Sequence, residues 1–128
     1  MCNKVLIVED DETILEVYSK ILKKIGYEVY ESKNIYDALE LWQEHKIGIV
    51  LSDLSMDDNL DGLSLCSRIR GKDLRTILIA VTGNASENLL EICLNVGFRD
   101  LLIKPVSLDL LVSTVKWASD QHDRWKDL

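Results

Sequence analysis

Short runs of apolar and often β-branched residues alternate along this chain with longer segments in which apolar residues recur at helical spacing. Runs such as VLIV and ILIAV are apolar throughout, so the strands that they form need cover on both faces. A helix between successive strands makes these strands parallel and places helices on both sides of the sheet. The alternation predicts an α/β fold, a (βα)5 chain with a doubly wound five-stranded parallel sheet. The predicted strands are residues 4–9, 27–32, 47–53, 76–82 and 100–103.

We expect a helical segment after each predicted strand. Gly26 ends the first helical stripe, which contains Ile14, Leu15, Tyr18, Ile21, Leu22 and Ile25. Asn34 begins the second, which contains Ile35, Ala38, Leu39 and Trp42. A third helix is predicted over about 63–69 before Gly71, and a fourth over about 86–96 before Gly97. The fifth begins near its cap Ser107 and is expected to bury Leu108, Leu111, Val112 and Val115.

The size of the chain fits one compact domain. It has 128 residues, of which 47% are hydrophobic, and this is enough for a sizeable core. We expect a single domain over 1–128, with a core of about 4–118 and a C-terminal helix extension of about 119–128. The odd set of cysteines has no metal-ligand spacing, so Cys2, Cys66 and Cys93 are expected to be reduced, the last two in the core.

The charge balance excludes several classes of partner. Fifteen Lys and Arg against twenty-two Asp and Glu give a net charge of −7, and the basic residues do not cluster. We therefore expect no direct binding of nucleic acid and no binding to anionic membranes. The longest apolar runs, 5–8 and 77–81, are far shorter than the ~20 residues that span a bilayer, and no signal-peptide pattern is present. These observations predict a cytoplasmic protein.

Polar residues with complementary chemistry follow the predicted strands. Glu9 and Asp10 come after the first strand, Asp53 ends the third, Thr82 ends the fourth and Lys104 follows the fifth. Taken alone, each of these residues is more typical of a structural role, as the cap of a helix, a residue that favours strands or a charged residue in a loop. Ligands in open α/β sheets bind at the carboxyl ends of the strands, so together these residues predict a site on one rim of the sheet.

Three carboxylates on one rim repel one another unless a cation compensates them. All-oxygen ligation by a few carboxylates is the preference of Mg2+, which also bridges to phosphate oxygens. A carboxylate nucleophile, a metal, a lysine and a hydroxyl are the parts of a phosphoryl-transfer site. The rim therefore predicts Mg2+-dependent phosphoryl transfer.

Four segments, VLIVEDDE, IVLSDLSM...DG, AVTGNA and LLIKP, resemble the receiver domain of two-component response regulators. The resemblance runs from Lys4 to about Trp117. It implies the flavodoxin-like strand order 2-1-3-4-5. It also implies a signalling switch that receives its phosphoryl group from a phosphohistidine of a sensor histidine kinase or a phosphotransfer protein.

The resemblance assigns a role to each rim residue. Asp53 is the implied phosphoacceptor, Thr82 the switch hydroxyl and Lys104 the cationic partner of the phosphoryl group. The implied Mg2+ ligands are Asp10, Asp53 and the backbone carbonyl of Ser55, with Glu9 acting through water. The Lys104–Pro105 bond is expected to be cis. Asp11 falls one place beyond the acidic pair, and we assign it to a helix N-terminus.

Two departures from the family pattern concern switching. Asp57 stands where the family has a proline, and the segment up to Gly62 is one residue longer, with Asp58 and Asp61 as further acids. These acids are either solvated, the more typical case, or they modulate access of a partner or of the metal. Leu101 stands where the family commonly has Tyr or Phe, so the aromatic movement that accompanies switching in the family is not available.

The last helix offers a candidate interaction surface. Trp117 is expected on a face next to the core stripe, with Leu110 and Thr114. In the family, the fourth helix, fifth strand and fifth helix form a common surface for self-association or effector binding, and an exposed Trp117 would anchor it. The alternative for Trp117 and Trp125 is a tail that packs back on its own domain.

Three classes of function remain open at this stage. The leading hypothesis is a phosphorylation switch, which turns over no separate metabolite and is not a conventional enzyme. The second is an interaction module that works without phosphorylation, which the altered loop after Asp53 and Leu101 favour and the complete rim set opposes. The third is a Mg2+-dependent phosphatase, which would need an acid at the position of Ser55.

Overall fold

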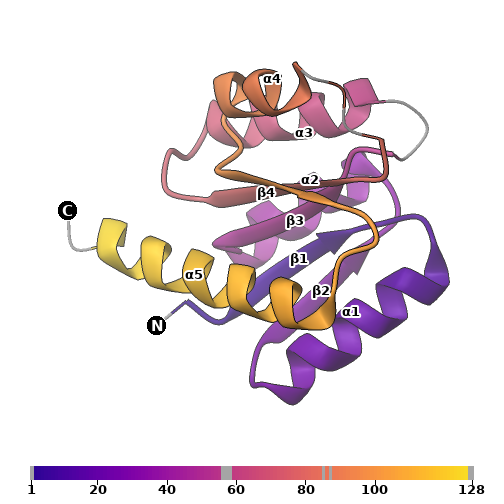
Figure 1. Cartoon of the computed structure of the whole chain (residues 1–128). Coiled ribbons are helices and arrows are strands. Elements are labelled where there is room, and N and C mark those ends of the chain that lie inside the picture. Colours follow the sequence, from indigo (N-terminus) through magenta and orange to yellow (C-terminus); the bar gives the residue numbers. More distant parts are fainter. Residues whose placement is uncertain (1, 56–58, 85, 87, 127–128) are drawn as a thin grey trace.

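The computed structural model describes residues 2–55, 59–84, 86 and 88–126. The strands are β1 (Lys4–Val8), β2 (Glu28–Ser32), β3 (Ile49–Asp53), β4 (Ile77–Thr82) and β5 (Asp100–Ile103). The helices are α1 (Glu12–Lys24), α2 (Ile35–His45), α3 (Asn59–Arg70), α4 (Leu89–Val96) and α5 (Leu108–Lys126). Strands and helices alternate along the chain (Figure 1), as the apolar pattern predicts.

The strands form one parallel sheet in the order β2-β1-β3-β4-β5. This confirms the predicted fold and strand order. The register aligns Val8 with Ser52, and Asp53 with Val81, so β1, β3 and β4 end at the same edge of the sheet. The residues that follow these strands are thereby brought together.

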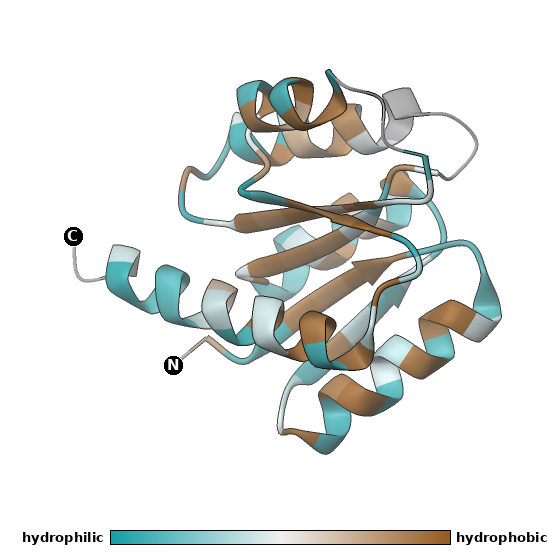
Figure 2. Ribbon diagram, in the orientation of Figure 1, coloured by the Kyte–Doolittle hydropathy of each residue, from teal (hydrophilic) through white to brown (hydrophobic). Residues whose placement is uncertain are grey.

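Helices cover both faces of the sheet. Figure 1 shows α1 and α5 on one side and α3 and α4 on the other. Alternate residues of β1 face opposite cores: Val5 packs with residues of α1 and α5, whereas Leu6 packs with residues of α2, α3 and α4. Every residue of the central strands β3 and β4 is buried, and both strands are largely apolar (Figure 2). Their polar residues lie at the carboxyl ends, Ser52 and Asp53 in β3 and Thr82 in β4. Burial on both faces explains why these strands read as continuous apolar runs.

Side-chain caps begin three of the helices. The Asp11 carboxylate accepts hydrogen bonds from the N–H groups of Thr13 and Ile14 at 3.0 and 3.2 Å, which confirms its assignment to a helix N-terminus. Asn34 caps α2 by accepting from the Asp37 N–H at 2.9 Å. The Ser107 hydroxyl accepts from the Leu110 N–H at 3.1 Å. Each cap satisfies a backbone donor that the first helical turn leaves without a partner.

The structure corrects several details of the expected core. Leu108, the first residue of α5, is 42% exposed, and Leu111 is the first α5 residue in the core. Thr114 is buried between Leu111 and Ala118 instead of lying on the exposed face, and Val112 is only half-buried. Ile25 is 37% exposed because it is the C-cap residue of α1.

Two helix starts also differ from the expected ones. Helix α3 begins at Asn59, about four residues earlier than the apolar pattern indicated, and α4 begins at Leu89, about three residues later. Asn88, at the N-cap of α4, makes no side-chain cap, and the Leu89 N–H bonds to the Ser86 carbonyl in a turn before the helix. Polar residues at both starts carry no apolar periodicity, so the sequence pattern could not locate them.

The C-terminal part of α5 packs against the start of the chain. The Cys2 N–H donates to the Asp123 carboxylate at 2.7 Å, and the Ser119 hydroxyl donates to the Cys2 carbonyl at 2.5 Å. The Arg99 guanidinium lies 5.4 Å from the centre of the Trp125 ring. Trp125 therefore packs on its own domain, whereas Trp117 is 38% exposed.

Cys66 and Cys93 are free thiols in the core, as expected. Among the described residues, no helix has both the length and the apolar character needed to cross a membrane.

Candidate functional site

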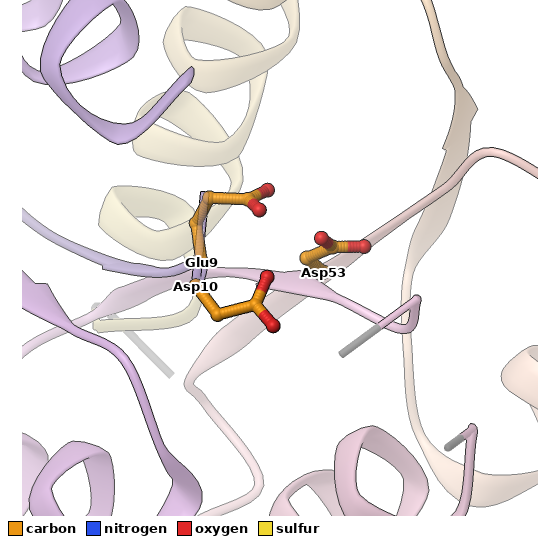
Figure 3. A group of neighbouring side chains, drawn as sticks. All are labelled: Glu9, Asp10 and Asp53. Atoms are coloured by element: carbon orange, nitrogen blue, oxygen red, sulfur yellow. The ribbon is translucent and has the colours of Figure 1, made fainter. Parts of the chain in front are cut away.

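The carboxyl edge of the sheet gathers the five residues selected from the sequence. Glu9 and Asp10 follow β1, Asp53 ends β3, Thr82 ends β4 and Lys104 follows β5. Figure 3 shows the carboxylates of Glu9, Asp10 and Asp53 grouped together, and one oxygen of each lies within 4.8 Å of the others. The spatial grouping predicted for these acids is therefore present in the fold.

Lys104 links the two buried acids. Its Nζ donates to Asp53 Oδ2 at 2.8 Å and to Glu9 Oε2 at 3.2 Å. Asp53 and Glu9 are only 3% and 2% exposed, whereas Asp10 is exposed. The Ser55 N–H donates to Asp53 Oδ1 at 2.8 Å, so both carboxylate oxygens of Asp53 have donors. Paired hydrogen bonds of this kind allow a buried charge to persist.

The two buried acids, Asp53 and Glu9, have different proton affinities. Burial by itself raises the pKa of Asp53, but hydrogen bonds with Lys104, Glu9 and the Ser55 N–H outweigh it and lower the pKa below the usual value. For Glu9, burial and the hydrogen bond with Asp53 raise the pKa to about 7. Burial opposes the charge of Lys104, yet its bonds to Asp53 and Glu9 raise the pKa of the ammonium group. Asp53 is thus held as a carboxylate.

The acidic cluster suits a divalent cation. With all three acids ionised and Lys104 protonated, the cluster carries a formal charge of 3 × (−1) + 1 = −2. The donors are carboxylate oxygens, which is the ligand chemistry of hard ions such as Mg2+. Asp10 leaves the cluster open to solvent, where an ion could enter and retain water. The residues therefore fit a metal-binding site.

Thr82 and Ser55 are engaged within the loops that surround Asp53. Thr82 is buried, and its hydroxyl donates to the Asn84 carbonyl at 3.4 Å and accepts from the Asn84 N–H at 3.2 Å. The Ser55 hydroxyl accepts from the Gly83 N–H at 3.1 Å and so joins the loop after β3 to the loop after β4. This contact between the Ser55 hydroxyl and Gly83 was not predicted from the sequence. The only signal for Gly83 was its place directly after Thr82.

The structure describes one of the two departures from the family pattern and only part of the other. Leu101 is half-buried and packs against the core on the side of α2, α3 and α4. Asp57 and Asp58 lie outside the described residues, as does the side chain of Asp61, so the expectations for that loop stay predictions. The Lys104–Pro105 peptide bond is cis, as the resemblance implies.

A largely apolar hollow of about 570 Å³ lies beside the acidic cluster. Lys104 lines it together with residues of α1 and of the segment that leads into α5. The other lining residues are Thr13, Ile14, Val17, Tyr18, Gly83, Pro105, Val106 and Leu108. A partner that occupied this hollow would lie directly next to Lys104.

A parallel (βα)5 sheet with an acidic cluster and an ion-paired lysine at its carboxyl edge defines a phosphoacceptor class of protein. The family model described as the response regulator receiver domain matches residues 5–116, and the chain belongs to this family. It is a receiver domain of two-component signal transduction.

Known proteins with different overall organisation share this domain. The sensor histidine kinase RcsC of Escherichia coli is 32% identical over 123 residues, which are 96% of this chain and 13% of the kinase. The nisin biosynthesis regulatory protein NisR of Lactococcus lactis is 32% identical over 126 residues, which are 98% of this chain and 54% of that protein. The chain thus spans between 13% and 54% of the length of these relatives.

A solved structure shares the fold over almost the whole chain. The CheY-like response regulator receiver domain protein from Methanospirillum hungatei superposes with a TM-score of 0.88 at 27% sequence identity. The match covers 97% of this chain and 98% of that one.

Proposed function

We propose that Asp53 is the phosphoacceptor of this receiver domain and that a phosphohistidine of a sensor histidine kinase or of a phosphotransfer protein is its donor. The observation that carries this proposal is the state of Asp53, a buried carboxylate whose pKa is lowered and which lies between Lys104 and the Ser55 N–H. A carboxylate that stays ionised at neutral pH is available as a nucleophile.

In the proposed reaction, a carboxylate oxygen of Asp53 attacks the phosphorus atom of the donor. The new P–O bond forms as the P–N bond breaks, and its electron pair returns to the imidazole nitrogen of the leaving histidine, which takes up a proton. Lys104, which now bonds to Asp53 and Glu9, pairs with an oxygen of the transferred group. Thr82, one strand away, supplies a hydroxyl to another oxygen once it releases Asn84.

We further propose that the metal of this site is Mg2+, held by Asp10, Asp53 and the Ser55 carbonyl, with Glu9 acting through water. When bound, Mg2+ neutralises charge on the phosphoryl oxygens. The cluster's formal charge and its all-oxygen donors support this choice. The protein modifies only itself, so we propose that it is a switch and not an enzyme with a separate substrate.

We assign partner binding to two surfaces. The apolar hollow beside Lys104 suits the phosphodonor, because a donor bound there lies next to the site of transfer. The face of α4, β5 and α5 suits self-association or an effector, because it exposes large apolar side chains. These are Leu90, Leu94, Ile103, Leu110 and Trp117.

The domain limits, a single unit over 1–128 with a core of about 4–118 and an extension of about 119–128, are part of the same proposal. A cytoplasmic location and the absence of direct nucleic-acid binding remain predictions from the sequence.

Acetyl phosphate as donor, with and without Mg2+, tests the phosphoacceptor. We expect the wild-type protein to gain one phosphoryl group by intact mass only with Mg2+, and Asp53→Asn to gain none. Gain by Asp53→Asn would place the acceptor elsewhere. If the wild-type protein gains no group with any donor or metal, an interaction module that works without phosphorylation becomes the better explanation.

A further inference from the structure

Three of the donor groups next to Asp53, the Lys104 ammonium, the Ser55 N–H and the Gly83 N–H, already have acceptors within the protein. Lys104 donates to Asp53 and Glu9, and the Ser55 N–H donates to Asp53. The Gly83 N–H donates to the Ser55 hydroxyl. A phosphoryl group on Asp53 therefore arrives among donors that must exchange one acceptor for another.

The contact between Ser55 and Gly83 joins the loop after β3 to the loop after β4 through the Ser55 hydroxyl. Ser55 lies two residues after Asp53, and Gly83 directly follows Thr82. A Cβ atom built on Gly83 would lie 3.9 Å from Ser55 Oγ and 4.0 Å from Lys104 Cδ, so Gly83 sits between the two residues that bond the Asp53 oxygens. Its N–H is thus directed at a hydroxyl on the border of the phosphorylation site.

A phosphoryl group would compete with the Ser55 hydroxyl for this N–H. It adds strong acceptor oxygens with ionic charge to the Asp53 side chain. A hydrogen bond from an N–H group to a charged oxygen is stronger than one to a neutral hydroxyl. Ser55 is exposed, so its hydroxyl can return to water when Gly83 turns to the phosphoryl group.

We propose that the Ser55 hydroxyl is a latch of the unphosphorylated state: it holds the Gly83 N–H and must release it when Asp53 is phosphorylated. Ser55 is then a positioning residue that acts through Gly83 and shifts the balance toward the unphosphorylated conformation. This inference rests on the proposed function of Asp53. It concerns the side chain of Ser55, whereas the proposed metal ligand is the backbone carbonyl of the same residue.

Beryllium fluoride, titrated in the presence of Mg2+ as a stand-in for the phosphoryl group, tests the latch. Ser55→Ala lacks the hydroxyl, so we expect it to bind the probe roughly two- to fivefold more tightly than the wild-type protein, the worth of one exposed hydrogen bond. Ser55→Thr keeps the hydroxyl and is expected to match the wild type. In the free proteins, the Gly83 amide is expected to exchange with solvent faster in Ser55→Ala than in the other two.

The affinity for Mg2+ alone is the internal control, because all three proteins keep the carbonyl of residue 55. It is expected to stay the same, and a change in it would show damage to the whole loop and overturn the assignment to the hydroxyl. Equal or weaker binding of the probe by Ser55→Ala would overturn the latch while leaving Asp53 as the acceptor. Failure of the wild-type protein to bind beryllium fluoride would overturn the proposed function, and the latch with it.

Discussion

Glu9 is the rim residue whose charge depends most on its surroundings. Its pKa is raised from 4.5 to about 7 by burial and by the hydrogen bond with Asp53, so the folded, metal-free protein keeps a proton that the unfolded chain has lost. The stability linked to that proton is complete below 4.5 and is lost as the pH rises through about 7. Asp53 has a lowered pKa, so its contribution is lost only in acid, below its ordinary value of 3.8.

We therefore expect the free energy of unfolding of the metal-free protein to fall by on the order of 1–3 kcal/mol between pH 5 and pH 8. Urea denaturation in EDTA measures it. Glu9→Gln removes the titrating group and is expected to flatten this dependence. A profile in Glu9→Gln as steep as that of the wild type would assign the effect to another group.

Ser52 is a second buried polar residue, and its role differs from that of Glu9. Its hydroxyl has no hydrogen-bond partner among the described residues, although the residue is fully buried in β3. An unpaired buried hydroxyl costs free energy that an alanine does not. We expect Ser52→Ala to raise the free energy of unfolding by about 1 kcal/mol.

Ser32→Ala is the matched control for Ser52→Ala. The Ser32 side chain is also buried, but its hydroxyl donates to the Asn34 carbonyl at 2.7 Å. Its removal is expected to lower the free energy of unfolding by about 1 kcal/mol. Chemical denaturation measures the free energy of unfolding of both variants. A loss of stability in Ser52→Ala would mean that the Ser52 hydroxyl of the wild-type protein has a hydrogen-bond partner.

At the scale of elements, Arg70 at the end of α3 connects this helix to the end of α4 by a hydrogen bond. Its guanidinium donates to the carbonyl groups of Asp73, Leu74 and Gly97, the last at 2.6 Å. Gly97 has a φ of +129°, and a Cβ atom there would lie 2.8 Å from Arg70 Nε. A side chain at position 97 is thus opposed both by the backbone conformation and by the arginine.

We expect Gly97→Ala to lower the free energy of unfolding by about 2 kcal/mol or more, as strain and displacement of Arg70 add together. Gly71→Ala is the control, because its Cβ atom would meet nothing closer than the Ser67 carbonyl oxygen at 3.4 Å. That change is expected to stay within about 0.5 kcal/mol of the wild type. Thermal unfolding measures the stability of both variants. If both lose the same amount of stability, position 97 is no more sensitive to a side chain than position 71.

The elements themselves were predictable because their cause is local. A strand buried on both faces is apolar at every position, and a helix on a sheet has an apolar stripe, so both can be read from neighbouring residues. The rim residues followed in turn, since Glu9, Asp53 and Thr82 sit at strand ends. The contact of Ser55 with Gly83 was not predictable, because it depends on how closely two loops approach in space. The burial of Thr114 likewise depends on which part of α5 overlies the sheet.

The whole molecule is organised around one charged edge. The parallel strands bring Asp10, which follows β1, and Asp53, which ends β3, to the same edge. Their two charges, joined by that of Glu9 when the pH exceeds its pKa of about 7, exceed the single charge of Lys104. This imbalance destabilises the folded state until a cation binds there. Binding of the cation and folding are therefore thermodynamically linked.

We expect Mg2+ to raise the melting temperature of the wild-type protein and to have little effect on Asp10→Asn, which loses the exposed acid of the cluster. A ligand at a hundred times its dissociation constant stabilises by about 2.7 kcal/mol, so the wild-type shift should be easily measured. Asp11→Asn is the matched control: the change removes an adjacent acid, and asparagine serves equally well as an N-cap. If Asp10→Asn responds to Mg2+ as the wild type does, Asp10 is not a ligand. If Asp11→Asn loses the response, the relevant charge is that of the helix start.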